Sequence, residues 1–329
     1  MNRSHRGLVA VAVAFLAGAV LGLLLLLLVA KSRQGAASRG GTDSLVLYCA
    51  QDQVFSEAVL GEFTRTTGLK VRTIHDSEAV KTVGLANRLI AEIQNPRADV
   101  FWGNEELRTR QLAARGVFGT NRIGSADAGW VAFGSRTRRL VIDSRKLPAS
   151  ERPSSLIELT NARWKGKLSL AMPLFGTAST HFHVLRAKWG EAVWRNWCKA
   201  LLANQPFLEP GNSHVVRRVV RGEALVGLTD SDDIAVARVE GAQVQALALE
   251  DDFLSIPNSV ALVRPASPGS PARKLVEFLM SDPVRARLVA SGALEAGSPP
   301  PGRWVQPDWE RVLKDLDATV RDLEGTFHQ

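Results

Sequence analysis

The chain has 329 residues, of which 45% are hydrophobic and 22% charged, and its formal net charge at pH 7 is +8. Residues 1–43 carry five Lys or Arg and one Asp, so half of that excess lies at the N-terminus. The rest is only mildly basic and has no dense basic run with interleaved aromatic residues, which argues against nucleic-acid binding. Its length is sufficient for two lobes with separate cores.

The first predicted element is apolar and very long. Residues 7–30 contain no charged side chain and are flanked by Arg6 and Lys31. As a helix they would extend about 36 Å, enough to cross a bilayer core of about 30 Å. A secretory signal has a core of only about 7 to 15 apolar residues. The sequence therefore predicts a transmembrane anchor at 1–31, with a long cleaved signal segment as the alternative. Residues 32–44 are rich in Gly, Ser and Ala and predict a flexible tether.

A first run of elements then alternates strand and helix. Short apolar runs predict strands at 44–50, 69–74 and 98–103. Apolar residues at helical spacing predict helices at 54–68, 80–94 and 106–116. This order is typical of a mainly parallel sheet covered by helices.

A second run follows a basic crossover segment at 134–143. Strands are predicted at 167–173, 224–229, 244–250 and 256–265, and helices at 182–204, 213–223, 272–280 and 282–292. A last amphipathic helix carries Val312, Leu316 and Leu323 on one face. The fold class is therefore α/β with two lobes: residues 45–137 and 258–329 form lobe 1, and residues 138–257 form lobe 2.

Polar clusters follow several predicted strands. They read "CAQDQ", "WGNEE", "PLFGTAST", "PGNSH" and "TDSDD". Ligands of open α/β sheets bind outside the carboxyl ends of the strands, so we expect these clusters to converge in a cleft between the lobes. N-capping of the next helix is the alternative for Ser56, Ser213 and the pair Asp232 and Asp233.

These segments resemble the solute-binding proteins of bacterial ABC importers, in particular the ferric-iron-binding type. The resemblance runs from Leu45 to about Leu294 and is carried by "LVLYCAQDQ", "RADVFWGNEE", "WKGKLSLAMP" and "GNSHVVRRVVRGEALVGLTDSDD". It implies a type II periplasmic-binding fold, in which two lobes close on a ligand in a central cleft. Here that fold would be preceded by the N-terminal transmembrane helix.

The ligand site implied by the resemblance departs from the ferric binders. Asp52 stands where they have a His, and Asn104, followed by Glu105, stands where they have a Glu. Asp232 and Asp233 replace two adjacent tyrosines, and the single tyrosine of the chain lies within the first strand. The anion-binding Ser and Asn positions are better kept. The predicted ligand-binding residues are Asp52, Asn104, Glu105, Thr177, Ser179, Asn212, Ser213, Asp230, Asp232 and Asp233.

Converging carboxylates repel one another unless a cation lies between them. Hard cations take oxygen ligands, which makes Asp52, Glu105, Asp232 and Asp233 the candidate metal ligands. An organic amine or aminophosphonate is the alternative, held by charge-assisted hydrogen bonds. No cofactor is expected beyond ferric iron or another hard cation as the transported ligand.

The resemblance predicts the exported substrate-binding component of an ABC-type importer, delivering its ligand to permease and ATPase subunits. We expect it outside the cytoplasm, anchored on the periplasmic side of the inner membrane, with a monomeric soluble part. A ligand-sensing ectodomain without transport is the alternative. An enzyme is not favoured, because no nucleophile constellation accompanies the acids. Cys49 and Cys198 lie far apart, and the sequence leaves open whether they pair.

Overall fold

A computed structural model of the chain describes residues 44–76, 81–118, 123, 129–247, 254–297 and 305–328. The predicted anchor at 1–31 and all of the predicted tether except Ser44 lie outside this part. Within the described residues, no helix has the length and apolarity needed to cross a membrane. Residues Ser44–Gln329 form one compact unit, and the following paragraphs concern that unit alone.

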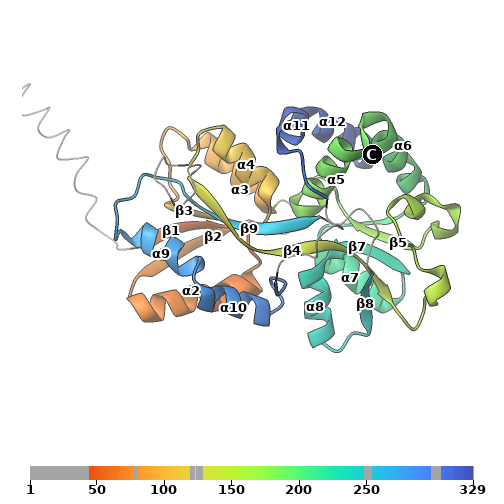
Figure 1. Ribbon diagram of the computed structural model, residues 1–329, viewed down its shortest axis with the longest axis horizontal. Coiled ribbons are helices and arrows are strands. Elements are labelled where there is room, and N and C mark those ends of the chain that lie inside the picture. The colour runs from red at the N-terminus through yellow and green to blue at the C-terminus, as the bar shows by residue number, and fades with distance from the viewer. Residues whose placement is uncertain are drawn as a thin grey trace, which may run out of the picture. The chain divides into compact units, whose positions relative to one another are not determined.

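Lobe 1 is a sheet with helices on both faces (Figure 1). Its elements are β1 (Ser44–Cys49), α2 (Gln53–Thr67), β2 (Lys70–His75), α3 (Lys81–Ala91), β3 (Val100–Gly103), α4 (Glu106–Ala114), α9 (Pro271–Leu279) and α10 (Asp282–Ala290). β1 pairs in parallel with both β2 and β3, as the alternating pattern predicts. One core packs α2, α9 and α10 against the sheet, and a second packs α3 and α4 against its other face.

Lobe 2 is built in the same way. Its elements are β5 (Leu168–Ala171), α5 (Gly176–Trp189), α6 (Glu191–Ala203), β6 (Phe207–Glu209), α7 (Asn212–Arg221), β7 (Val226–Asp230), α8 (Ser231–Val239) and β8 (Val244–Leu247), with short 3₁₀ turns at Ala149–Glu151, Ile157–Thr160 and Ala162–Trp164. β5 pairs in parallel with β6 and β7. Valines of α7 at helical spacing bury one face of that helix against the sheet.

Two long strands, β4 (Trp130–Asp143) and β9 (Ser255–Leu262), join the lobes into one sheet. The described strands follow the order β2-β1-β3-β9-β4-β7-β5-β6, with β8 on the other edge of β4. β4 pairs antiparallel with β9 up to Thr137 and with β7 from Arg138 onward. The polar crossover of the sequence is therefore a continuous strand.

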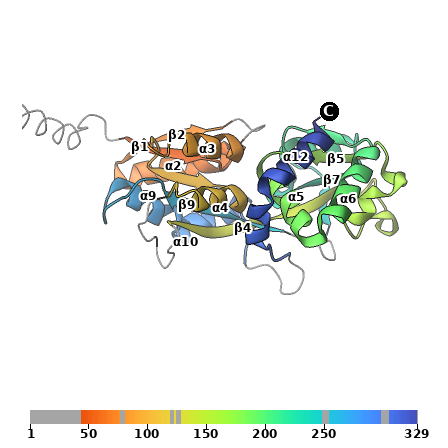
Figure 2. The ribbon, with the colours of Figure 1, turned by 90° about the horizontal axis from the view of Figure 1, so that it is seen from above.

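The C-terminal helices α11 (Trp309–Lys314) and α12 (Leu316–Phe327) correct one assignment. Residues 258–329 were assigned to lobe 1, but Leu323 and Phe327 lie in the lobe 2 core. The Phe327 ring packs edge-on against Phe182 of α5, with ring centroids 5.8 Å apart. Figure 2 shows α12 alongside α5. The apolar face of a helix predicts that it is buried, but it does not predict which neighbour covers it.

Candidate functional site

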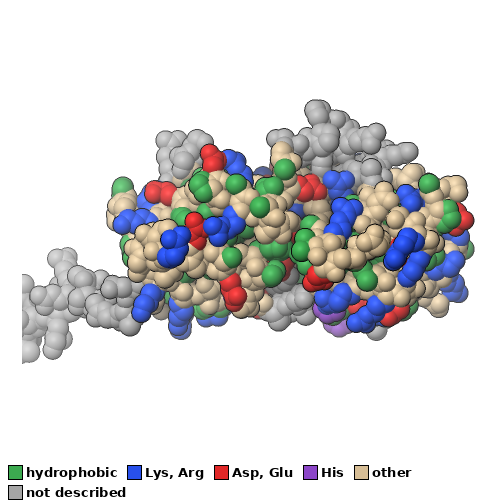
Figure 3. Space-filling view, turned by 90° about the horizontal axis from the view of Figure 1, so that it is seen from below, with side chains coloured by type: hydrophobic (Ala, Val, Ile, Leu, Met, Phe, Trp, Pro, Cys, Tyr) green, Lys and Arg blue, Asp and Glu red, His purple; other side chains and the backbone are tan. Residues whose placement is uncertain are grey.

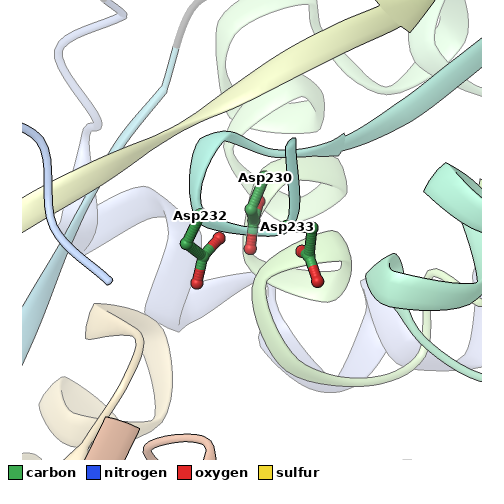
Figure 4. A group of neighbouring side chains, drawn as sticks. All are labelled: Asp230, Asp232 and Asp233. Atoms are coloured by element: carbon green, nitrogen blue, oxygen red, sulfur yellow. The ribbon is translucent and has the colours of Figure 1, made fainter. Parts of the chain in front are cut away.

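The acidic cluster occupies the turn between β7 and α8. β7 ends at Asp230, and α8 begins at Ser231. The Ser231 hydroxyl accepts a hydrogen bond from the Thr137 N–H (3.1 Å), which ties this turn to β4. The side chains of Asp230, Asp232 and Asp233 point the same way (Figure 4), with one carboxylate oxygen of each lying within 4.8 Å of the others. Asp230 is the N-cap residue, but its side chain makes no capping bond, so its carboxylate has another role.

Asp230 is held by donors from three elements. Arg138 Nη1 on β4 donates to its Oδ1 at 2.7 Å. Thr177 Oγ1 and Asn212 Nδ2 donate to its Oδ2 at 2.6 and 3.1 Å. Burial alone would raise the pKa of Asp230, but Arg138 and Arg136 outweigh it and the pKa is lowered. Asp230 is therefore an ionised anchor whose oxygens are already engaged.

Arg136 lies on β4, one of the two strands that join the lobes, and its side chain reaches the acids. Its side chain is 3% exposed, and Nε lies 3.4 Å from Asp230 Oδ2 and 3.3 Å from Asp232 Oδ2. Its Nη1 donates to Asn258 Oδ1 on β9 at 3.2 Å. Burial would lower the pKa of Arg136, but the surrounding aspartates outweigh it and the pKa is raised. Arg136 thus stays charged and neutralises part of the cluster.

Sequence reasoning missed Arg136 and Arg138, because the segment was interpreted as a basic crossover. The sequence does contain a signal that this segment is a strand with both arginines on one face. Arg136 and Arg138 are two residues apart in a run that continues as "LVID", and side chains two apart on a strand share one face. The register also places Arg138 opposite Asp230. Basic residues on one strand face beside an acidic strand tip predict buried ion pairs.

Lobe 1 closes the site from the opposite side. Asp52 precedes α2, and Asn104 follows β3, where its Oδ1 accepts from Thr82 Oγ1 at 2.8 Å. Together with lobe 2 these residues enclose a cavity of about 40 Å³. It is lined by Asp52, Asn104, Arg136, Ala171, Met172, Phe175, Gly176, Thr177, Ala178, Pro210, Gly211, Asn212, Asp230, Asp232 and Asp233. A space of this size admits an ion or a few water molecules.

Three predicted residues lie elsewhere, and Glu105 is the most informative of them. Its carboxylate accepts from the Arg108 N–H (3.0 Å) and from Thr180 Oγ1 (2.6 Å), and burial raises its pKa. Glu105 therefore caps α4 and joins the lobes, and it is not placed as a metal ligand. Ser179 is buried within α5, and its Oγ lies 3.4 Å from His183 Nδ1. Ser213 borders a neighbouring groove.

The tyrosine and the cysteines take no part in the cavity. The Tyr48 hydroxyl donates to Glu92 at 2.9 Å, within lobe 1. Cys49 and Cys198 are free, buried thiols in the cores of different lobes, so they do not pair with each other. Burial raises the pKa of Cys49 to about 12, which keeps it protonated and unreactive.

The charges around the cavity favour a cation. Asp52, Asp230, Asp232 and Asp233 contribute four negative charges, and Arg136 and Arg138 contribute two positive ones. The excess of negative charge lies within a largely desolvated site, where electrostatic attraction is strong. The acidic donors are oxygen atoms, the ligand type that suits hard metal ions.

Comparison with known proteins identifies the class. Residues 45–293 match the model of a family described as bacterial extracellular solute-binding protein, and the chain belongs to that family. The "Major ferric iron-binding protein" of Neisseria meningitidis serogroup A is 26% identical over 266 residues, covering 75% of this chain and 78% of that protein. The "Iron uptake protein A1" of Synechocystis sp. is 25% identical over 272 residues, covering 76% and 74%.

Solved structures support the same fold at lower identity. Iron-bound HitA from Pseudomonas aeruginosa superposes with a TM-score of 0.73 and 17% identity, covering 86% of this chain and 99% of that one. AfuA from Actinobacillus pleuropneumoniae, solved with fructose-6-phosphate, gives a TM-score of 0.74 and 19% identity, covering 87% and 99%. The two-lobed periplasmic-binding fold predicted from the sequence is thereby confirmed. The chain is a solute-binding protein of the kind that serves ABC importers.

Proposed function

We propose that this protein captures a hard metal cation outside the cytoplasm and delivers it to an ABC permease and its ATPase. Ferric iron is the cargo named for its curated relatives and is our first candidate. The observation that carries the proposal is the oxygen-rich, negatively charged cavity where strand ends of both lobes meet. An anchor at residues 1–31 would keep the binding lobes close to the permease.

The residues divide into ligands and supports. Asp232 and Asp233 from lobe 2 and Asp52 from lobe 1 are the proposed metal ligands, with Asn104 as a further oxygen donor. Ligand oxygens at 2.3–2.6 Å from a Ca²⁺-sized ion can lie up to about 5 Å apart. The 4.8 Å spread of the acidic cluster falls within that limit for an ion of this size, and a smaller ion such as Fe³⁺ would need to draw the oxygens closer together. Asp230 supports the site by holding Arg138 and Asn212. Since ligands come from both lobes, a bound cation would favour the closed form.

Metal analysis of full-length protein purified without chelators tests this proposal, together with isothermal titration of Fe³⁺, Mn²⁺ and Ca²⁺. We expect one equivalent of metal per chain, and we expect the double variant Asp232→Asn, Asp233→Asn to lose it. Glu277→Gln with Glu310→Gln, two exposed changes on α9 and α11, raises the net charge by the same amount and is the matched control. Tight binding of simple anions with no response to any metal would overturn the proposal.

A further inference from the structure

The C-terminal helices α11 and α12 contact both lobes, and α12 is held by lobe 2. The Thr319 hydroxyl accepts a hydrogen bond from Arg186 Nη1 of α5 at 2.8 Å. Asp322 Oδ1 accepts from Arg195 Nη2 of α6 at 2.7 Å. The apolar face of α12 lies in the lobe 2 core. Because polar and apolar contacts act together along its length, α12 is a fixed part of lobe 2.

The helix before it, α11, reaches lobe 1 instead. Arg110 Cζ on α4 lies 4.9 Å from the ring centroid of Trp309, the first residue of α11. The same carbon lies 5.4 Å from the ring centroid of Trp130, the first residue of β4. Arg110 Nε also donates to Glu106 Oε1 at 2.7 Å, which fixes the direction of the side chain. Cation–π contacts to two indoles therefore join the first turn of α11 to α4 and β4.

An apolar core shared by both lobes accompanies these contacts. It contains the buried side chains of Leu107 on α4, Val184 on α5, Val312 on α11, Leu316 on α12 and Ile256 on β9. Since α4 belongs to lobe 1 and α5 to lobe 2, separating the lobes here would expose apolar surface to water, which is unfavourable. The C-terminal helices thus help to hold α4 and α5 together.

A buried hydrogen bond crosses between the lobes on the same side of the cavity. Thr180 Oγ1 of α5 donates to Glu105 Oε2 at 2.6 Å, and both residues are buried. Glu105 directly follows Asn104, which lines the cavity. The α4–α5 side of the cleft is therefore closed by buried polar and apolar contacts.

The other side of the cavity borders a groove of about 410 Å³. The groove is lined by Phe55 of α2 in lobe 1 and by residues of α7 and α8 in lobe 2. Asp232 and Asp233 line both the groove and the cavity. Figure 1 draws α11 and α12 at the top of the molecule and α2, α8 and α10 at the bottom, and Figure 3 shows the molecule from that lower side. The acids thus lie between a closed side and a groove.

We propose that α11 and α12 form a strap that keeps the α4–α5 side of the cleft closed, so that the lobes open only toward the groove. Trp309 and Arg110 are positioning residues in this strap. They set how far the empty lobes open, and neither is among the residues that line the cavity. This opening is a property of the empty protein and does not depend on which solute binds.

Double electron–electron resonance on the empty full-length protein tests the strap. Spin labels on Glu57→Cys of α2 and Val239→Cys of α8, both exposed positions, report the distance across the groove. The native cysteines are buried, so they should stay unlabelled. Trp309→Ala should shift the distances to longer values, because the strap loses its contact with lobe 1.

Two further variants probe the same contact. Arg110→Gln should produce the same shift, because it removes the cation that both indoles contact. Trp309→Phe keeps an aromatic ring beside Arg110 and should keep the distances of the unmodified protein. If the proposed cation site is correct, Trp309→Ala should also raise the dissociation constant for Mn²⁺ by about threefold or more, since a smaller fraction of the protein is then competent to bind.

Trp189→Ala is the matched control. Trp189 is half-buried like Trp309, but its ring packs within lobe 2, with its centroid 5.2 Å from that of Trp197. It should leave the distances between the labels unchanged. Unchanged distances in both Trp309→Ala and Arg110→Gln, or an equal shift in Trp189→Ala, would overturn the strap. The distance measurement needs no solute, so a failure to bind any metal would overturn the proposed function alone.

Discussion

Asp230 and Asp233 lie three residues apart, yet their carboxylates have different surroundings. Asp230 is 1% exposed and forms ion pairs with two buried guanidinium groups, whereas Asp233 is half-buried and lies 3.5 Å from the Thr229 hydroxyl. Asp230→Asn should lower the free energy of unfolding by about 3 to 5 kcal/mol, because it leaves buried charge uncompensated. Asp233→Asn should cost less than about 1 kcal/mol. Urea unfolding followed by circular dichroism measures both.

Asp233→Asn should weaken metal binding more than Asp230→Asn does, although it destabilises the fold less. Asp233→Asn should weaken metal binding by about tenfold or more, since it removes a charged ligand while leaving the fold intact. Isothermal titration at a temperature where both variants are folded gives the affinities. If Asp233→Asn unfolds the protein as readily as Asp230→Asn, the division into ligand and support is wrong.

His183 gives the molecule a predictable response to acid. It is 2% exposed within α5, and its Nδ1 lies 2.8 Å from the Ser179 carbonyl oxygen. Burial lowers its pKa to about 4, against about 6.5 in an unfolded chain. As the pH falls, His183 is therefore protonated in the unfolded chain before it is protonated in the folded one. The free energy of unfolding should fall by up to about 3 kcal/mol as the pH is lowered from 6.5 to 4. Above pH 6.5 His183 contributes nothing to this dependence.

The variant His183→Gln separates this residue from the other titrating groups. Its unfolding free energy should change less with pH between 6.5 and 4 than that of the unmodified protein. Urea unfolding at half-unit pH intervals gives both curves. Parallel curves over this window would show that His183 does not carry the effect.

At the scale of elements, β4 and β9 carry a buried hydrogen-bonded chain from one lobe to the other. Asp232 pairs with Arg136, Arg136 donates to Asn258, and Asn258 Nδ2 donates to Gln51 Oε1 at 3.0 Å. Gln51 is adjacent to Asp52, so the chain runs between the acids of the two lobes. We expect it to help transmit solute binding from lobe 2 to the position of lobe 1.

The variant Asn258→Ala breaks this chain without changing any charge. It should weaken metal binding several-fold and reduce the change in radius of gyration that the metal produces in small-angle scattering, because two buried hydrogen bonds are lost. Thr137→Val is the matched control. It lies on β4, the strand that carries Arg136, and its hydroxyl donates to Glu295 (2.7 Å), outside the hydrogen-bonded chain. An equal effect of both variants would assign the coupling to the strands in general.

The candidate site was partly predictable from local patterns. Parallel strands present their carboxyl ends at one edge of a sheet, so polar strand tips such as those at Asp52, Asn104 and Asp232 can be expected to meet. The pattern could not separate Asn104, which lines the cavity, from Glu105, which faces α5 and caps a helix. A shift of one residue reverses the direction of a side chain at the end of a strand. Tertiary packing decides between the two.

At the scale of the whole molecule, the alternation of strands and helices predicted the two-lobed α/β class. Partners distant in sequence were not predictable, because apolar periodicity reports burial without naming the neighbour. The docking of α12 on lobe 2 and the placement of Cys49 and Cys198 in different cores are examples. Both depend on the path of the chain through β4 and β9.

The folded unit should not need the first 43 residues. All five apolar cores are built from residues within Leu45–Phe327, and Ser44–Gln329 is a compact unit. A chain starting at Ser44 should therefore be monomeric, with unchanged metal affinity and a melting temperature within a few degrees of the full-length value. Size-exclusion chromatography with light scattering and thermal circular dichroism check this.

A chain starting at Gln51 is the contrasting case, because it lacks β1, which pairs with both β2 and β3 and buries Leu47. We expect that shorter chain to aggregate. Aggregation of the Ser44 chain as well would mean that residues 1–43 contribute to the fold.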